Sequence, residues 1–250
     1  IVLCRLSGAG LEYTGVIAGM SGSPVYFDGK LLGAVAYTWA FNKEPIAGIT
    51  PFEQMQSAAA EPHYAVDRWE PDADGSMPVA ALDLTSVGAV AAGQATSEEA
   101  APVAALGGMR PITMPLAATG FTAGSLRRLG ELFEDFGAVP VATGGAAPEG
   151  LPKVGIEPGG VLGVSLVRGD FDVSGLGTVT HVEDGRVWGW GHPFLESGNC
   201  HYLLRSGWVH VVNPKQDLST KMGSAVDVLG VVDADVSTCV AGELGAEADL

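Results

Sequence analysis

Short valine-rich runs separated by glycine and proline are the feature that most limits what this chain can fold into. The 250 residues include 36 glycines and 15 prolines, and both residue types interrupt helices. The runs between them carry β-branched side chains and are bounded by turn-forming residues, which is the pattern of strands. The sequence therefore predicts a mainly β protein with many tight turns.

The first strands are expected within residues 1–56. Residues 25–27 form a short predicted strand, Asp28-Gly29 is a hairpin turn signal, and residues 31–37 form the returning strand. A further strand is expected at 46–49, followed by a short helix from residue 52. We interpret this region as one β-barrel portion of the fold.

The opening residues carry a separate expectation. Residues 1–6 have the composition of the middle of a buried strand, and residue 1 is isoleucine rather than methionine. We therefore expect the chain to be a piece of a longer protein from which any targeting segment has been lost.

Residues 57–108 are rich in alanine, glycine and proline and predict a connector that runs over the surface. The β pattern returns within residues 109–250, the second predicted portion, which ends the chain. Its strand candidates are residues 161–167, 177–182, 208–212 and 226–232.

One amphipathic helix is predicted near residues 123–136. Its apolar side chains recur at spacings of three and four residues, with Thr122 or Ser125 as the N-cap and Gly137 as the terminator. The members of this stripe are Leu126, Leu129, Leu132, Phe133 and Phe136. We interpret it as a packing helix with a solvated charged face.

Charge and composition exclude several classes of function. The formal net charge of −16 argues against nucleic acid or an anionic membrane as a partner, because both require clustered lysine and arginine. Every apolar stretch is interrupted before it reaches the length of a membrane-spanning helix. No dinucleotide or phosphate-loop motif occurs, so no cofactor is expected.

A metal site is not expected either. Cys4, Cys200 and Cys239 lie far apart without a Cys-x-x-Cys pair, which favours buried free thiols and leaves a Cys200–Cys239 disulfide open. Asp233 and Asp235 alternate without other oxygen ligands nearby, which is weak evidence for calcium.

The chemistry of the chain centres on residues 19–24, which read Gly-Met-Ser-Gly-Ser-Pro. A serine hydroxyl is a weak nucleophile that needs a base and donors for the developing oxyanion. The flanking glycines allow a tight turn that leaves Ser21 accessible. The backbone amides of Gly19 and Ser21 can then converge as an oxyanion hole. We therefore interpret this segment as a nucleophile loop.

The residues after the loop resemble the strand-turn-strand that follows the nucleophile in chymotrypsin-like peptidases, which implies a double β-barrel ancestry. Residues 16–24 together with 29–35 also resemble the nucleophile region of the SpoIVB-type (S55-like) serine peptidases. Residues 177–180, Asp184-Gly185 and residues 191–193 (Gly-His-Pro) resemble the histidine region of that family.

This resemblance covers residues 1–55 and 150–245, and it implies a serine endopeptidase that forms an acyl-enzyme. It implies Ser21 as the nucleophile and His192 as the general base. The substrate it implies is a polypeptide, either the chain itself or one specific partner protein. It also implies a location outside the cytoplasm, either secreted or periplasmic.

The chain departs from the SpoIVB-type pattern in three respects. The histidine follows the serine instead of preceding it, which geometry permits because such sites do not depend on chain order. No PDZ domain is visible. The family's acid precedes its serine, but here Glu12 is the only carboxylate before Ser21, so the third member lies upstream or is missing. A second hypothesis therefore stays open, a catalytically inactive secreted binding or structural module that keeps the peptidase fold.

The other histidines are expected to be packed or surface residues. His181 falls in a predicted strand, His201 and His210 lie among aromatic and aliphatic residues, and His63 falls in the predicted connector. His192 differs from them because the glycine before it and the proline after it fix a turn at the end of an aromatic-rich strand.

Overall fold

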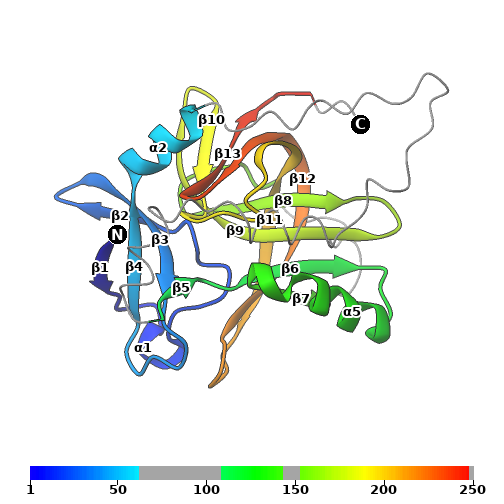
Figure 1. The fold of residues 1–250 in the computed structure, drawn as a ribbon, viewed down its shortest axis with the longest axis horizontal. Coiled ribbons are helices and arrows are strands. Elements are labelled where there is room, and N and C mark those ends of the chain that lie inside the picture. The colour runs from blue at the N-terminus through cyan, green and yellow to red at the C-terminus, as the bar shows by residue number, and fades with distance from the viewer. Residues whose placement is uncertain (62–107, 143–152, 248–250) are drawn as a thin grey trace.

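Two β-sheets make up most of residues 1–61, 108–142 and 153–247, which are the residues that this computed structural model describes (Figure 1). The smaller sheet is a half-barrel with the strand order β1-β4-β3-β2, and β5 pairs with β3. Its strands are β1 (Val2–Arg5), β2 (Pro24–Phe27), β3 (Lys30–Thr38), β4 (Ile46–Pro51) and β5 (Arg110–Pro111).

The larger sheet has the order β10-β13-β12-β11-β8-β9-β6-β7, and β10 also pairs with β9. That extra pairing closes the strands from β8 to β13 into a six-stranded barrel within the described residues. The barrel strands are β8 (Val161–Val167), β9 (Asp172–Glu183), β10 (Arg186–Gly189), β11 (Gly198–Asn213), β12 (Thr220–Val236) and β13 (Cys239–Leu244). The predicted mainly β fold with double-barrel character is thus confirmed.

The predicted hairpin near the start is present as β2 and β3. Asp28 and Gly29 both have positive φ, 49° and 75°, as a tight two-residue turn between strands requires. The predicted buried strand at residues 1–6 is wrong in its burial. Among the residues that the structure describes, β1 pairs only with β4 at the edge of the half-barrel, and Leu3 is 50% exposed.

The predicted amphipathic helix is α5 (Ala123–Phe133), followed by the 3-10 turn η2 (Glu134–Phe136). The Thr122 hydroxyl accepts a hydrogen bond from the Ser125 amide at 3.2 Å, so Thr122 is the N-cap. Gly137 ends the η2 turn with a φ of 66°. The helix expected from residue 52 is α2 (Phe52–Ala60), so residues 57–60 belong to this helix rather than to the connector. A short helix, α1 (Leu11–Thr14), was not predicted.

Two strands beside α5 were also not predicted. These are β6 (Met114–Thr119), which pairs with β9, and β7 (Ala138–Ala142), which runs parallel to β6. The rest of the expected connector and His63 lie outside the described residues. None of the helices in the described ranges is long and apolar enough to cross a membrane.

Separate apolar cores fill the two sheets. Trp190, Phe194 and Leu204 are among the residues of the barrel core, whereas Ile17, Met20 and Ile49 belong to the half-barrel core. The two sheets meet at a seam where the serine loop (residues 19–24) bonds both Val35 of β3 and Thr178 of β9 and the histidine loop (residues 191–193) contacts β3 and β4, and both predicted site residues lie in it.

Candidate functional site

The main chain of the serine loop is held on both sides of the seam. On the half-barrel side the Gly22 amide donates to the Val35 carbonyl at 2.8 Å, and the Val35 amide donates to the Ser23 carbonyl at 2.9 Å. On the barrel side the Thr178 amide donates to the Ser21 carbonyl at 2.8 Å. The loop thus connects β3 with β9, and its conformation depends on both sheets.

Gly22 is required by this close approach. Its φ is 95°, in the left-handed region, and a Cβ at this position would lie 1.9 Å from the Thr178 carbonyl oxygen. The Thr180 hydroxyl donates to the Gly22 carbonyl at 2.8 Å, so the glycine is fixed from the barrel side as well. Only glycine fits here, as the turn prediction required.

Lys221, which the sequence did not single out, anchors the start of the loop. Its Nζ donates to the Gly19 carbonyl at 2.9 Å and to the Thr178 hydroxyl at 2.9 Å. The Thr178 hydroxyl in turn donates to the same Gly19 carbonyl at 3.1 Å. Burial lowers the pKa of Lys221 from 10.5 to about 8, so this cation is protonated at neutral pH and holds the loop as a donor.

His192 reaches the seam from the opposite side. It follows β10, and the Gly191 carbonyl before it accepts a hydrogen bond from the Thr50 hydroxyl of β4 at 2.6 Å. A Cβ on Gly191 would lie 2.9 Å from the Cβ atoms of Ala34 and Ala36. The barrel-derived histidine loop is therefore packed against the half-barrel, just as the half-barrel-derived serine loop is packed against the barrel.

The two loops meet on one short stretch of β3. Val35 holds the serine loop, while its neighbours Ala34 and Ala36 contact the histidine loop. A second contact joins them just after β10, since a Cβ on Gly22 would lie 2.5 Å from the amide nitrogen of Trp190. The structure thus brings together two segments that are about 170 residues apart in the chain, the separation of Ser21 and His192.

Both predicted site side chains are buried in this seam. Ser21 and His192 are each 0% exposed, and neither Ser21 Oγ nor His192 Nε2 has a hydrogen-bond partner. No hydrogen bond therefore joins the two atoms in this structure. The expected accessibility of Ser21 is wrong here, because the loop packs between two sheets rather than on a surface.

The hydrogen bond on the other ring nitrogen fixes the tautomer of His192. Nδ1 donates to the Pro193 carbonyl at 2.7 Å, so the proton of the neutral ring lies on Nδ1 and the lone pair lies on Nε2. Burial lowers the pKa of His192 from 6.5 to about 4, and the Pro193 hydrogen bond opposes that shift. At neutral pH the ring is uncharged, with Nε2 free to accept a proton.

The two amides predicted for the oxyanion hole are not equally available. The Gly19 amide donates to the Thr113 carbonyl at 3.1 Å, whereas the Ser21 amide makes no hydrogen bond within the described ranges. Gly19 has a φ of 88°. The Gly19 amide can serve an oxyanion only after it has left the Thr113 carbonyl.

No carboxylate contacts the His192 ring among the described residues. Glu12 is not the missing acid, because its carboxylate accepts from the Gly8 amide at 2.8 Å on the exposed side of the molecule. That hydrogen bond lowers its pKa. Asp235 is linked to the histidine loop by hydrogen bonds, since its oxygens accept the amides of Phe194, Leu195 and Ser197.

The remaining candidates take structural positions. His181 stacks on Trp188 in β9 and β10, and His210 bonds the Ser224 hydroxyl at 3.0 Å, while His201 is exposed on β11. Asp172 forms a partly buried ion pair with Arg205. Cys4, Cys200 and Cys239 are all free thiols. In the described ranges no group of three histidine, cysteine or acidic side chains converges as a metal site would.

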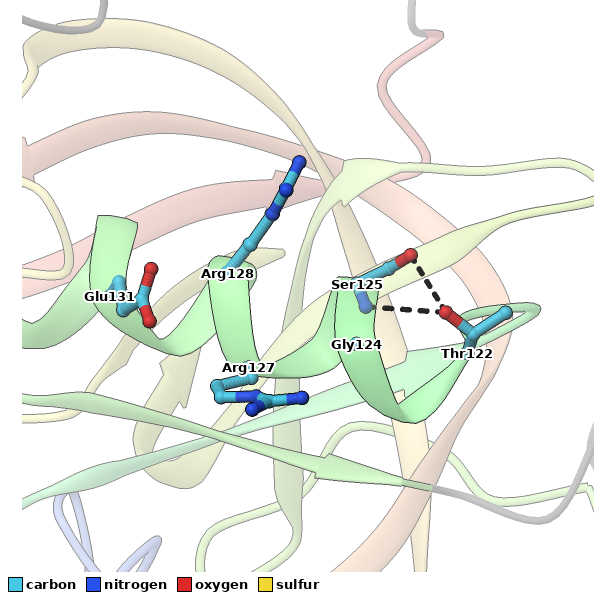
Figure 2. Close-up of a pocket in the computed structure, with 6 residues that line it drawn as sticks. All are labelled: Thr122, Gly124, Ser125, Arg127, Arg128 and Glu131. Carbon is cyan, nitrogen blue, oxygen red and sulfur yellow. Dashed lines mark hydrogen bonds between the residues drawn. The ribbon is translucent and has the colours of Figure 1, made fainter.

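The concave surfaces lie away from the two buried side chains. A pocket at the start of α5 is lined by Thr122, Gly124, Ser125, Arg127, Arg128 and Glu131, and none of these is a predicted site residue (Figure 2). A smaller groove of about 130 Å³ lies between residues 14–16, 38–42, 110–113 and 215–219. Thr113 and Ser219 in its lining accept the amides of Gly19 and Ala18, so this groove borders the base of the serine loop.

Comparison with known proteins assigns this chain to no family. No protein-family model, curated protein or solved structure matches the chain.

The buried histidine leads to the first testable prediction. Because the folded-state pKa is about 4 and the ordinary value is 6.5, only the unfolded chain takes up this proton between those pH values. The free energy of unfolding therefore falls as the pH drops through this window, by roughly 3 kcal/mol for this group. His192→Asn removes the titration while an amide remains to donate to Pro193. Urea unfolding from pH 7 to pH 4 should show a shallower loss of stability in this variant, and equal slopes would contradict the assignment.

Proposed function

We propose that this chain is a serine peptidase in which Ser21 is the nucleophile and His192 the general base. The observation that supports this proposal most directly is that Ser21 Oγ and His192 Nε2 are both buried in one seam without a hydrogen-bond partner. An unpartnered buried polar atom costs about 1–3 kcal/mol, and such costs are typical of sites kept for function. The resemblance of both segments to the SpoIVB-type peptidases supports the same pair.

The proposed reaction uses the tautomer that the Pro193 hydrogen bond sets. Ser21 Oγ attacks a peptide carbonyl carbon while Nε2 of His192 takes its proton, and the other ring proton stays on Nδ1, hydrogen-bonded to the Pro193 carbonyl. The imidazolium then protonates the leaving amine as the C–N bond breaks. Water hydrolyses the acyl-enzyme, with His192 again as the base. Backbone amides at Ser21, and at Gly19 once it leaves Thr113, would stabilise the oxyanion.

The burial of the pair bears on the kind of substrate. A fully enclosed serine reacts only when the seam opens, so general digestion of proteins is disfavoured. We propose that the substrate is a polypeptide segment of the chain itself or of one partner, and that the protein acts outside the cytoplasm. Both proposals come from the SpoIVB resemblance.

A catalytically inactive binding module is the second candidate. The observations that favour it are the lack of a hydrogen bond between Ser21 and His192 and the occupied Gly19 amide. In that case the loops serve only to join the two sheets.

A fluorophosphonate probe separates the two candidates, because it reacts only with an activated serine. We expect slow labelling of the parent protein and none of Ser21→Ala. The matched control is Ser23→Ala, which removes the neighbouring hydroxyl that donates to the Met20 carbonyl at 2.6 Å and should still be labelled. A folded parent that stays unlabelled would favour the binding module, and labelling of Ser21→Ala would exclude Ser21.

A further inference from the structure

The peptide group between Pro193 and Phe194 is bound at both ends. Its carbonyl oxygen accepts the Nδ1 proton of His192 at 2.7 Å, and its N–H donates to Oδ1 of Asp235 at 2.6 Å. One planar amide therefore lies between the imidazole and a carboxylate. Both hydrogen bonds are short for their donor types.

Asp235 is placed to act on this peptide from the barrel interior. It lies near the end of β12 and is 0% exposed. Its other oxygen, Oδ2, accepts the amides of Leu195 at 2.8 Å and Ser197 at 3.1 Å. No cation pairs with it among the described residues. Burial raises the pKa of Asp235, and hydrogen bonds from the three amides and from the Ser197 side chain oppose that rise. These donors stabilise the negative charge of the carboxylate.

We propose that Asp235 is the positioning residue of the site and that it acts on His192 through the Pro193–Phe194 peptide. The proposal rests on the proposed roles of Ser21 and His192. In a direct triad, a carboxylate on Nδ1 sets the tautomer and stabilises the imidazolium. Here a peptide carbonyl contacts Nδ1, and the carboxylate lies one amide further away.

The physical basis is the cooperativity of hydrogen bonds in series. When a carboxylate accepts an amide N–H, electron density shifts toward the carbonyl oxygen of the same amide, which becomes a stronger acceptor. The strengthened Pro193 carbonyl holds the Nδ1 proton more firmly and stabilises the positive charge that forms when Nε2 takes the serine proton. The acid of the SpoIVB-type peptidases precedes the serine, whereas the carboxylate of Asp235 lies 43 residues after His192.

If Asp235 only stabilised the loop, it would accept the same three amide hydrogen bonds. The test must therefore measure a property of His192 itself. Asp235→Asn removes the charge at nearly constant shape. Nitrogen-15 NMR of the histidine ring gives the tautomer and the pKa of His192 independently of activity. We expect the variant to show a lower His192 pKa, less of the Nδ1–H tautomer, and fluorophosphonate labelling slower by roughly 10- to 100-fold, the range for removing an outer carboxylate that orients a histidine.

The matched control is Asp233→Asn. Asp233 lies two residues earlier on β12 and pairs with Arg186, so its replacement removes the same charge from the same strand without touching the peptide. It should leave the His192 tautomer and the labelling rate as in the parent. An Asp235→Asn protein that folds and keeps the parent's His192 signals would overturn the proposal.

The readouts also separate this proposal from the proposed function. An Asp235-dependent His192 tautomer in a protein that is never labelled supports the peptide-mediated link and refutes the peptidase. Labelling that depends on Ser21, with His192 unaffected by Asp235→Asn, refutes the link and keeps the peptidase.

If Asp235→Asn does not fold, the link can be tested in the parent protein instead. As His192 titrates, the chemical shift of the Phe194 amide proton should change more than that of the Leu195 amide proton. The Leu195 amide also bonds Asp235, but it does not belong to the Pro193–Phe194 peptide. Equal responses of the two amides would refute the link.

Discussion

His192→Asn is expected to slow the labelling of Ser21 by a fluorophosphonate by roughly 1,000-fold, within the range that a general base contributes. Asparagine can still donate to the Pro193 carbonyl, which His192 Nδ1 contacts at 2.7 Å, but it has no basic nitrogen in place of Nε2. The variant therefore removes the base and keeps the local hydrogen bond. Second-order rate constants from gel-based labelling at several probe concentrations measure the effect.

The control for this variant is His201→Asn, which changes an exposed histidine on β11 and should label at the parental rate. Circular dichroism and the thermal midpoint show whether His192→Asn is folded. A folded His192→Asn protein that labels as fast as the parent would exclude His192 as the base.

Gly22→Ala is expected to destabilise the protein by roughly 4 kcal/mol, the combined scale of a strained backbone and an overpacked contact. The added Cβ would lie 1.9 Å from the Thr178 carbonyl oxygen, at a φ of 95°. Neither the serine loop nor β9 can shift alone, because the Thr178 amide also bonds the Ser21 carbonyl. The expected result is a large fall in the free energy of unfolding in urea, or a chain that fails to fold.

Gly29→Ala separates backbone strain from the steric clash. Gly29 also has a left-handed φ, 75°, but a Cβ there would meet nothing within 4 Å. We expect a loss of about 1 kcal/mol for this variant, the cost of the left-handed conformation alone. If both variants lose the same free energy of unfolding, the serine loop packs less tightly against β9 than this structure shows.

Much of the architecture could be predicted because it depends on local patterns. The β2–β3 hairpin followed from Asp28-Gly29 between two apolar runs, and α5 followed from its apolar spacing and the Thr122 cap. The strands β6 and β7 were not predicted from the sequence. These two strands are stabilised by pairing with each other and, for β6, with β9, and such pairing is not encoded in a local sequence pattern.

The sequence by itself determined which residues are candidates for chemistry, because a glycine-flanked serine and a Gly-His-Pro turn are short motifs that can be found by inspection. It indicated Gly22 for the same reason, since glycine allows a tight turn, but the contact with the Thr178 carbonyl that excludes a Cβ there is tertiary. Only the tertiary structure decided that Ser21 and His192 share a seam, that both are buried, and that Gly19 bonds Thr113. It also decided the surroundings of His192, where the Pro193–Phe194 peptide links the ring to the carboxylate of Asp235 on β12. These relations join segments far apart in the chain, and closing a barrel places such segments together in a way that local pattern does not specify.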